Sequence, residues 1–411
     1  MQLQSLTGRS EQLARQVAAL LGFSIPISTA LDSVLLALVA ALWLAGGDLR
    51  RKLAIVATNP VALAALALFG MLVVGLFYGT HYPGDGLRHL GKYVDLLFIP
   101  IFVTLFQDAR MREIALRWFC AAMILTFAVA EMTMLGMLEN NPVLLRAAEF
   151  PGAFKMSIAH GLLSAFAAFV FALLAQREPQ LPQRLLFAVL ALVAVKNVLV
   201  VAVSRTAYLV LAVLALYFFF TLFRKRGLVI AGLLMGAVFA VVYGGSEVFR
   251  ERVDTVFVES GESRSQWPSR ESVTIRLEWY QRSLDIVLGH PLLGTGTGSF
   301  PRAYAETIKD KKSVSTTNPH NEYLLIAVQT GLAGLVLLLH LFWQQLRMSA
   351  RLATPVETQL ARGLVLTIAI GCLFNSLLLD HTEGLLFAWL TGLLFAGLQS
   401  DGEQRTVNSE R

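Results

Sequence analysis

Apolar runs of membrane-spanning length recur along the whole sequence, and short polar connections separate most of them. The hydrocarbon core of a bilayer is crossed by about 20 helical residues, so each run predicts one transmembrane segment. Backbone groups in lipid find no outside partner, which favours α-helices throughout. The pattern therefore predicts an all-α polytopic membrane protein with about twelve spans, near 13–28, 31–47, 57–78, 89–106, 113–135, 157–175, 184–203, 206–223, 228–244, 321–342, 360–379 and 383–399.

The longest polar stretch is an insert at 245–320, which holds ten Lys or Arg and ten Asp or Glu residues. A loop of this length is usually functional or disordered, and its apolar and aromatic content favours an ordered one. The chain then divides into spans one to nine at 1–244, the insert at 245–320, spans ten to twelve at 321–400, and a polar tail at 401–411.

Within the insert, residues 271–289 have the periodicity of an amphipathic helix. Its apolar stripe is formed by Val273, Leu277, Tyr280, Leu284 and Val287. Arg276 lies on the flank of this stripe, and two interpretations of it remain open. The side chain snorkels at the membrane surface, or it points into a cleft between the helix and the spans.

Composition agrees with the membrane class, because 15% of the residues are charged whereas a soluble domain has about 25%. Basic residues cluster in alternate connections, which places those connections and both termini in the cytoplasm. The insert then lies outside. Several cationic residues nevertheless fall near the outer ends of spans, where they suggest an anionic ligand: Arg88, Lys92, Lys155, His160 and Lys196.

Other features limit the chemistry. The glycine-rich run at 289–300 lacks the preceding strand and the Gly-Lys-Ser/Thr ending of a nucleotide loop, so it indicates a flexible or close-packed turn. Asp380 either caps the last span or rims a site. No cluster has metal-ligand spacing, and we expect no metal, no cofactor and no nucleic acid partner.

His320 stands where the insert meets span ten, in the stretch "STTNPHNEYLLIAVQTG". Asn318 can cap the helix and Pro319 suits its first position, which puts His320 in the first turn. The positive end of the helix favours a nearby anion and a neutral imidazole, and a neutral imidazole can act as a base near pH 7. The alternative is a histidine that only assists the cap.

Arg205 lies in "AVSRTAYL" at the outer junction of spans seven and eight. An arginine on the outer side runs against the usual bias of positive charge. A guanidinium can bind two phosphate oxygens at once, which suits a phosphate ligand. Anchoring at the membrane interface is the alternative explanation.

Three motifs together resemble the O-antigen ligase and polymerase superfamily. They are "HNEYLLIAVQTG" from His320, "SRTA" from Ser204, and "RLEWYQRSLDIVLGHPLLGTGTGSF" from Arg276. The resemblance covers mainly residues 150–400 and implies a membrane glycosyltransferase similar to the lipid-dependent GT-C type. It implies that Arg205 and Arg276 hold a diphosphate and that His320 is the essential base.

The resemblance further implies a glycan donor linked to undecaprenyl diphosphate, a lipid A–core acceptor, and a periplasmic active site in the bacterial inner membrane. Asn321 and Tyr323 of the histidine motif would join the substrate site. O-antigen ligase is our first hypothesis, because the insert directly precedes that motif. An O-antigen polymerase and a protein O-glycan ligase are alternatives, and a secondary transporter is a less favoured one.

Overall fold

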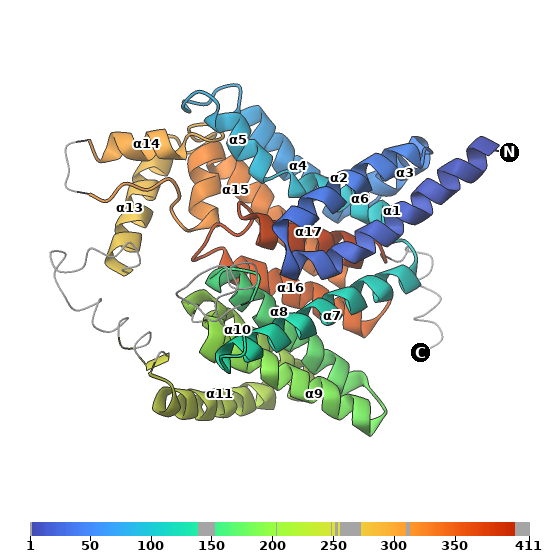
Figure 1. The fold of residues 1–411 in the computed structure, drawn as a ribbon. Coiled ribbons are helices and arrows are strands. Elements are labelled where there is room, and N and C mark those ends of the chain that lie inside the picture. The colour runs from blue at the N-terminus through green and yellow to red at the C-terminus, as the bar shows by residue number, and fades with distance from the viewer. Residues whose placement is uncertain are drawn as a thin grey trace.

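The computed structural model describes residues 2–138, 153–202, 204–247, 249–250, 254, 273–309 and 313–398. All the regular elements in these ranges are helices (Figure 1). In chain order they are α1 (Gln2–Ile27), α2 (Thr29–Ala45), α3 (Leu49–Ala57), α4 (Pro60–Gly75), α5 (Asp85–Lys92), α6 (Asp95–Leu105), α7 (Ala109–Met134), α8 (Ser157–Arg177), α9 (Leu181–Lys196), the π-helix η1 (Asn197–Ala202), α10 (Arg205–Phe223), α11 (Lys225–Gly245), α13 (Val273–Gly289), α14 (Phe300–Thr307), α15 (Glu322–Ser349), α16 (Pro355–Gly371) and α17 (His381–Phe395).

The helices support a polytopic membrane protein. Among the described residues, six helical segments are individually long and apolar enough to cross a bilayer: α7, α8, α9 with η1, α10, α11 and α15. The pair α2 and α3, bent by 113°, would make a seventh. The predicted span at 89–106 is divided, because α5 ends at Lys92 and α6 begins at Asp95.

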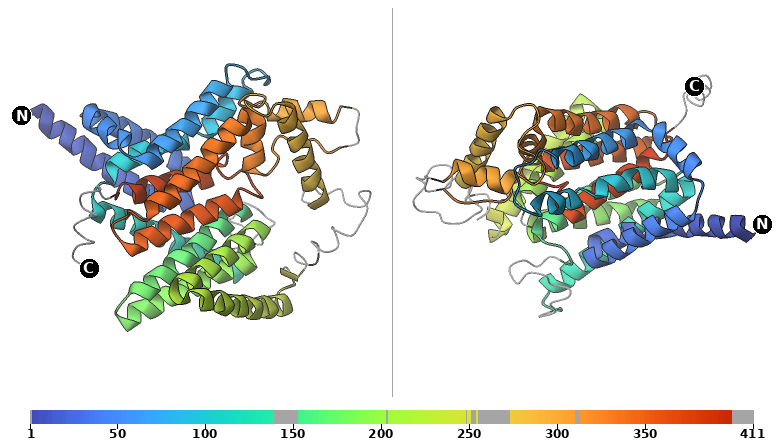
Figure 2. Two further views of the ribbon diagram at one scale, coloured as in Figure 1. Left: turned by 180° about the vertical axis from the view of Figure 1, so that it is seen from behind. Right: turned by 90° about the horizontal axis from the view of Figure 1, so that it is seen from above.

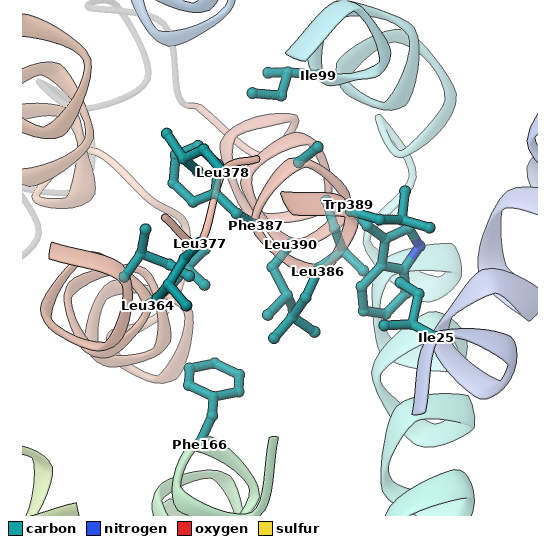
Figure 3. Close-up of a cluster of buried hydrophobic side chains, with 14 of the residues drawn as sticks. Ile25, Ile99, Phe166, Leu364, Leu377, Leu378, Leu386, Phe387, Trp389 and Leu390 are labelled. Carbon is teal, nitrogen blue, oxygen red and sulfur yellow. The ribbon is translucent and has the colours of Figure 1, made fainter. Parts of the chain in front are cut away.

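The core of the bundle is built around α17, which is apolar on all sides and buried from Thr382 to Phe395. A helix with this character needs other helices around it. Figure 3 shows its leucines and aromatic rings meeting side chains from α1, α6, α8 and α16. The Trp389 indole also donates a hydrogen bond of 2.8 Å to the Ala18 carbonyl, which ties α17 to α1.

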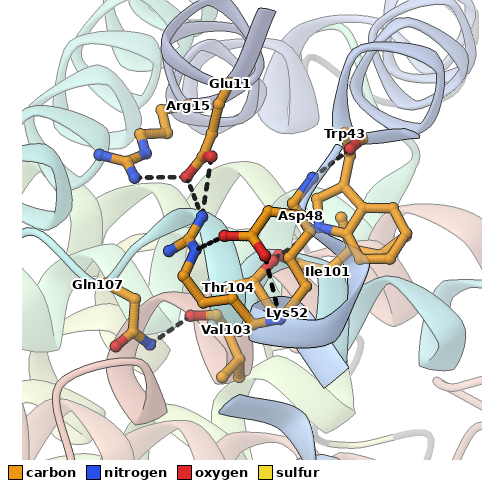
Figure 4. A network of polar contacts seen from close by, with 10 residues as sticks. Glu11, Arg15, Trp43, Asp48, Lys52, Ile101, Val103, Thr104 and Gln107 are labelled. Carbon is orange, nitrogen blue, oxygen red and sulfur yellow. Dashed lines mark hydrogen bonds and ion pairs between the residues drawn. The ribbon is translucent and has the colours of Figure 1, made fainter. Parts of the chain in front are cut away.

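The bend between α2 and α3 is closed by a network of polar contacts (Figure 4). Glu11 accepts hydrogen bonds from Arg15 at 2.6 Å and from Arg51 at 2.8 Å, and Arg51 also pairs with Asp48 at 2.9 Å. The Lys52 ammonium donates to the Trp43 carbonyl and lies 4.8 Å from the centre of the Trp43 ring. These contacts fasten α3 to α1 and α2.

The insert end of the molecule is opposite the N-terminal end of α1. In all three views α13 and α14 lie at one end of the bundle, and the start of α1 lies at the other (Figures 1 and 2). The connections α8–α9, α10–α11 and α15–α16 lie at the same end as the start of α1. The helices therefore separate the basic connections from the insert.

The glycine-rich run is a close-packed turn that supplies hydrogen-bond partners to the backbone at a break in α15. The helix is interrupted at Gly331, which has a φ of +65°. Backbone groups of the turn bond to the freed groups of α15: Thr295 N to the Val328 carbonyl at 2.8 Å, Gly296 N to the Gln329 carbonyl at 2.8 Å, and Leu332 N to the Pro291 carbonyl at 2.8 Å. This arrangement satisfies backbone groups that would otherwise be unpaired.

We expect Gly296→Ala to destabilise the protein by more than about 2 kcal/mol, because the substitution adds strain and a clash. Gly296 has a φ of +98°, and a Cβ there would lie 2.0 Å from the Gly79 Cα. Thermal unfolding in detergent micelles measures the effect. Gly289→Ala is the matched control, because a Cβ there meets nothing within 4 Å. Equal melting temperatures for the two variants would contradict the account of this turn.

Candidate active site

His320 lies just before α15 and not in its first turn, which corrects the sequence expectation. The N-cap is Asn321, whose side chain accepts a hydrogen bond of 3.0 Å from Leu324 N. Asn318 instead accepts from the backbone N–H of His320 at 2.8 Å. His320 has a φ of +54°, an uncommon conformation for a residue with a side chain. Such strain persists only where surrounding contacts fix it.

Those contacts come first from the connection between α16 and α17, at residues 372–380, hereafter the 372–380 loop. Asn321 donates to the Leu373 carbonyl at 2.9 Å, and Ser376 donates to Asn318 at 2.8 Å. The buried Glu322 accepts from Leu378 N at 3.0 Å. The start of α15 is therefore attached to this loop on both sides of His320.

The second set of contacts comes from α13 in the insert. The Tyr280 hydroxyl lies within hydrogen-bond distance of two carbonyls, those of His320 at 3.2 Å and Leu373 at 3.1 Å. The indole of Trp279 stacks on the His320 imidazole, with ring centres 5.3 Å apart and planes inclined by 27°. His320 is thus held between the insert and the 372–380 loop.

The electrostatic surroundings keep His320 neutral. Burial lowers the pKa of His320 below its ordinary value of 6.5, and the positive charge of Arg276 lowers it further. Both effects disfavour the charged imidazolium. At pH 7 the imidazole is therefore able to accept a proton.

Arg276 points toward the 372–380 loop. One of its terminal nitrogens, Nη1, donates to the Phe374 carbonyl at 3.3 Å. Its Nε is buried and has no hydrogen-bond partner among the residues that the structure describes. The side chain is only partly buried, so it combines an anchored nitrogen with a charge that is not neutralised by a nearby carboxylate in the described ranges. This arrangement suits an anion.

The face of α13 that packs inward matches the predicted stripe only in part, since Tyr280 and Val287 pack inward. Leu277 and Leu284 are 60% and 50% exposed, whereas Trp279, Ser283 and Ile286 are buried. The periodicity correctly predicted a helix, but α13 packs on α15, α14 and the chain leading to His320. Those partners select the face with Trp279.

Arg205 is the first residue of α10 and follows the N-cap Ser204, whose side chain accepts from Ala207 N. The next residue, Thr206, accepts a hydrogen bond of 2.8 Å from Asn375 of the 372–380 loop. Three consecutive loop residues therefore contact the neighbourhoods of all three candidates. Leu373 binds Tyr280 and Asn321 beside His320, Phe374 binds Arg276, and Asn375 binds α10 beside Arg205.

The remaining predicted cations take part mostly in other contacts within the protein. Lys155 is buried, 3.7 Å from Asp32 and 3.2 Å from the Thr382 hydroxyl. His160 is buried beside Asn197 at 3.2 Å. Exposed Arg88 pairs with Asp85 at 3.4 Å, Lys196 pairs with Glu131, and Lys92 is exposed on α5.

Two of the three other predicted residues, Asn321 and Tyr323, make hydrogen bonds within the protein. Asn321 caps α15 and binds the Leu373 carbonyl. The Tyr323 hydroxyl donates to the Ala369 carbonyl at 2.8 Å. Asp380 occupies the N-cap position of α17, but its side chain makes no capping hydrogen bond. The residue is exposed.

Sequence reasoning missed several residues that build the site. Glu322 accepts from the Tyr93 hydroxyl at 2.6 Å and so links α15 to the turn between α5 and α6. Trp279 follows Arg276 by three residues within the same motif, but the periodicity of the helix did not mark it. The 372–380 loop contributes mainly backbone carbonyls, which leave no signature in the sequence.

The structure thus describes a polytopic helical membrane protein in which residues 373–375 contact Arg276, the segment around His320, and Thr206 next to Arg205. Comparison with protein families gives a match to the O-antigen ligase family over residues 190–339. This segment runs from α9 into α15 and contains Arg205, Arg276 and His320. The resemblance to the O-antigen ligase family is therefore confirmed for this part of the chain. No curated protein matches the sequence.

Proposed function

We propose that the protein is a membrane glycosyltransferase that moves O-antigen glycan from undecaprenyl diphosphate to lipid A–core oligosaccharide. The observation that carries the proposal is the arrangement of Arg276, His320 and the start of α10 around residues 373–375, within a chain that matches the O-antigen ligase family. Positively charged groups next to a neutral base suit a donor whose leaving group is a diphosphate.

In the proposed reaction the hydroxyl oxygen of the acceptor sugar attacks the anomeric carbon of the donor glycan. The bond from that carbon to the diphosphate oxygen breaks, and undecaprenyl diphosphate leaves with the bonding electrons. The hydroxyl proton passes to the imidazole of His320. Direct attack of this kind inverts the anomeric centre.

The arginines would stabilise the departing diphosphate. Charge develops on the phosphate oxygens as the bond breaks, and fixed cations near those oxygens lower the barrier. Arg276 is suitable because the 372–380 loop anchors one nitrogen while the guanidinium stays accessible. We assign Arg205 the same role, because the next residue, Thr206, bonds to Asn375 of the loop. Two guanidinium groups can supply this stabilisation without a metal ion.

A periplasmic site follows if the basic connections face the cytoplasm. Those connections lie at the opposite end of the bundle from α13 and α14 (Figure 1). We propose about twelve membrane crossings of the GT-C type, with both termini in the cytoplasm of an inner-membrane protein. The apolar helices would hold the polyprenyl chain, and the insert would cover the glycan. Asn321, Tyr323, Asp380 and the outer cations remain candidates for substrate binding.

O-antigen polymerase and protein O-glycan ligase are the nearest alternatives, because they share the donor and the reaction. A secondary transporter differs in class and would use broken helices and ionisable groups deep in the membrane. In this protein the break in α15 is closed by the glycine-rich turn. The buried Asp32 and Asp95 lie close to the partly exposed His381 at the N-terminal end of α17, directly after the 372–380 loop. Both features favour an enzyme.

Reconstitution of the purified protein in liposomes tests the function. The donor is glycan linked to undecaprenyl diphosphate, and parallel reactions contain lipid A–core or a second donor molecule. We expect glycan on lipid A–core, with undiminished activity in excess EDTA. A lengthened lipid-linked glycan would identify a polymerase. Loss of activity in EDTA that magnesium restores would contradict the metal-independent mechanism, and substrate movement without transfer would indicate a transporter.

A further inference from the structure

We propose that Trp279 is a positioning residue that orients the imidazole of His320 and stabilises it after it has accepted a proton. This inference rests on the proposed function, in which His320 is the base. It assigns a catalytic contribution to the insert itself, through α13.

The indole of Trp279 is itself rigidly held. It is 3% exposed, and its Nε1 donates to the Val314 carbonyl at 3.2 Å. The same carbonyl lies 3.3 Å from the hydroxyl of Tyr304 in α14. Ser313, the preceding residue, donates to Glu278 at 2.9 Å. The Trp279 indole is therefore fixed by two helices of the insert, α13 and α14, and by the chain that leads to His320.

The orientation of the His320 imidazole depends on the Trp279 indole. The backbone of His320 is fixed by Asn318 at its N–H and by Tyr280 at its carbonyl. No hydrogen bond holds a ring nitrogen within the described part of the chain, so the nitrogens stay available to a substrate. Stacking on Trp279, with ring centres 5.3 Å apart, is the contact that defines the plane of the ring.

The two neighbours of the ring act in opposite directions on its charge. Arg276 disfavours the imidazolium, which keeps the resting base neutral. The face of an indole attracts a cation, so Trp279 favours the imidazolium that forms when His320 takes the acceptor proton. A base must be neutral before the reaction and stable afterwards, and this pair of neighbours meets both needs.

Substitution of Trp279 by leucine and by phenylalanine tests the inference. Leucine keeps the site apolar but removes the aromatic face, whereas phenylalanine retains it. We expect Trp279→Leu to lower kcat about 10- to 30-fold, which is the rate equivalent of one lost cation–π contact, while the KM for the donor stays within about twofold. The acid limb of the kcat–pH profile should move to lower pH, because the imidazolium loses stabilisation. Trp279→Phe should recover most of kcat and of the wild-type limb.

Gln281→Ala, an exposed change on the same helix, is the matched control and should behave as wild type. If Trp279→Leu does not accumulate, Trp279→Met gives the same comparison. A Trp279→Leu enzyme with wild-type kcat and pH profile overturns the inference, as does equal loss in the leucine and phenylalanine variants. These results differ from failure of the proposed function, which would appear as unimpaired transfer by His320→Ala and would remove the basis of this inference as well.

Discussion

Replacement of His320 by alanine is expected to lower the rate of glycan transfer by about 10²–10⁴-fold, the usual contribution of a general base. The reason is that the acceptor hydroxyl would lose the group that takes its proton, while both arginines remain. The initial rate in proteoliposomes, with saturating donor and lipid A–core, measures the effect. Donor binding should change little, because the imidazole is assigned to the acceptor side of the reaction.

The wild-type enzyme should also lose activity on the acid side. Burial and Arg276 lower the pKa of His320 below 6.5, so the imidazole is neutral at pH 7 and becomes protonated only as the pH falls through that lowered pKa. The rate should therefore be constant near neutrality and fall at lower pH. His340→Ala is the matched control, because His340 is exposed near the other end of α15. Unchanged transfer by His320→Ala would exclude its role as the base.

The helical membrane class could be predicted from the sequence for a clear physical reason. Apolar runs report burial in lipid directly. Arg205 and His320 are candidates because they stand at the ends of predicted spans, whereas Arg276 is a candidate because it lies on the flank of the apolar stripe of a predicted amphipathic helix. The number of crossings is harder to predict, because α6, α16 and α17 are short and the connection between α5 and α6 interrupts a continuous apolar run.

The cap of α15 shows why a local pattern can be shifted by a few residues. Asn318 and Asn321 are both good cap residues, and Pro319 favours the first of them on propensity alone. Tertiary contacts select the second: Glu322 N bonds to the Cys372 carbonyl at 2.9 Å, and the Glu322 carboxylate binds Leu378 N. These contacts join residues about fifty positions apart, and the sequence near His320 contains no information about them.

The same limit applies to the outer cations. Lys155 and Asp32 are far apart in the sequence but meet inside the protein. A single sequence shows that a lysine is unusual at the outer end of a span, but it does not show that the lysine pairs with a buried carboxylate. An unusual charge can therefore stabilise the fold or bind a ligand. Among the predicted cations, Arg276 has the geometry to bind a ligand, because the 372–380 loop anchors it through a neutral carbonyl and not a carboxylate.

Replacement of Arg276 by alanine is the other change expected to have a large effect. Removal of one group that stabilises developing charge usually lowers the rate by about 10²–10³-fold, and we expect a loss of this size in kcat/KM for the lipid-diphosphate donor. Arg205→Ala should give a loss in the same direction. Arg276→Lys should recover little activity if the guanidinium binds two phosphate oxygens, because an ammonium cannot reproduce that geometry.

Arg282→Ala is the control for Arg276, because it removes an arginine from the same helix. Arg282 lies 3.8 Å from both Glu278 and Asp285, so its charge is already balanced within α13. Loss of activity in both alanine variants would mean that transfer depends on the stability of α13 in general. Near-wild-type turnover by Arg276→Lys would mean that Arg276 acts as a simple positive charge.

Because the donor carries the diphosphate and the acceptor carries the hydroxyl, the Arg276 defect should appear first in kcat/KM for the donor, and the His320 defect should appear in kcat. This separation of two kinetic effects at residues held by one loop is what the assigned division of labour requires.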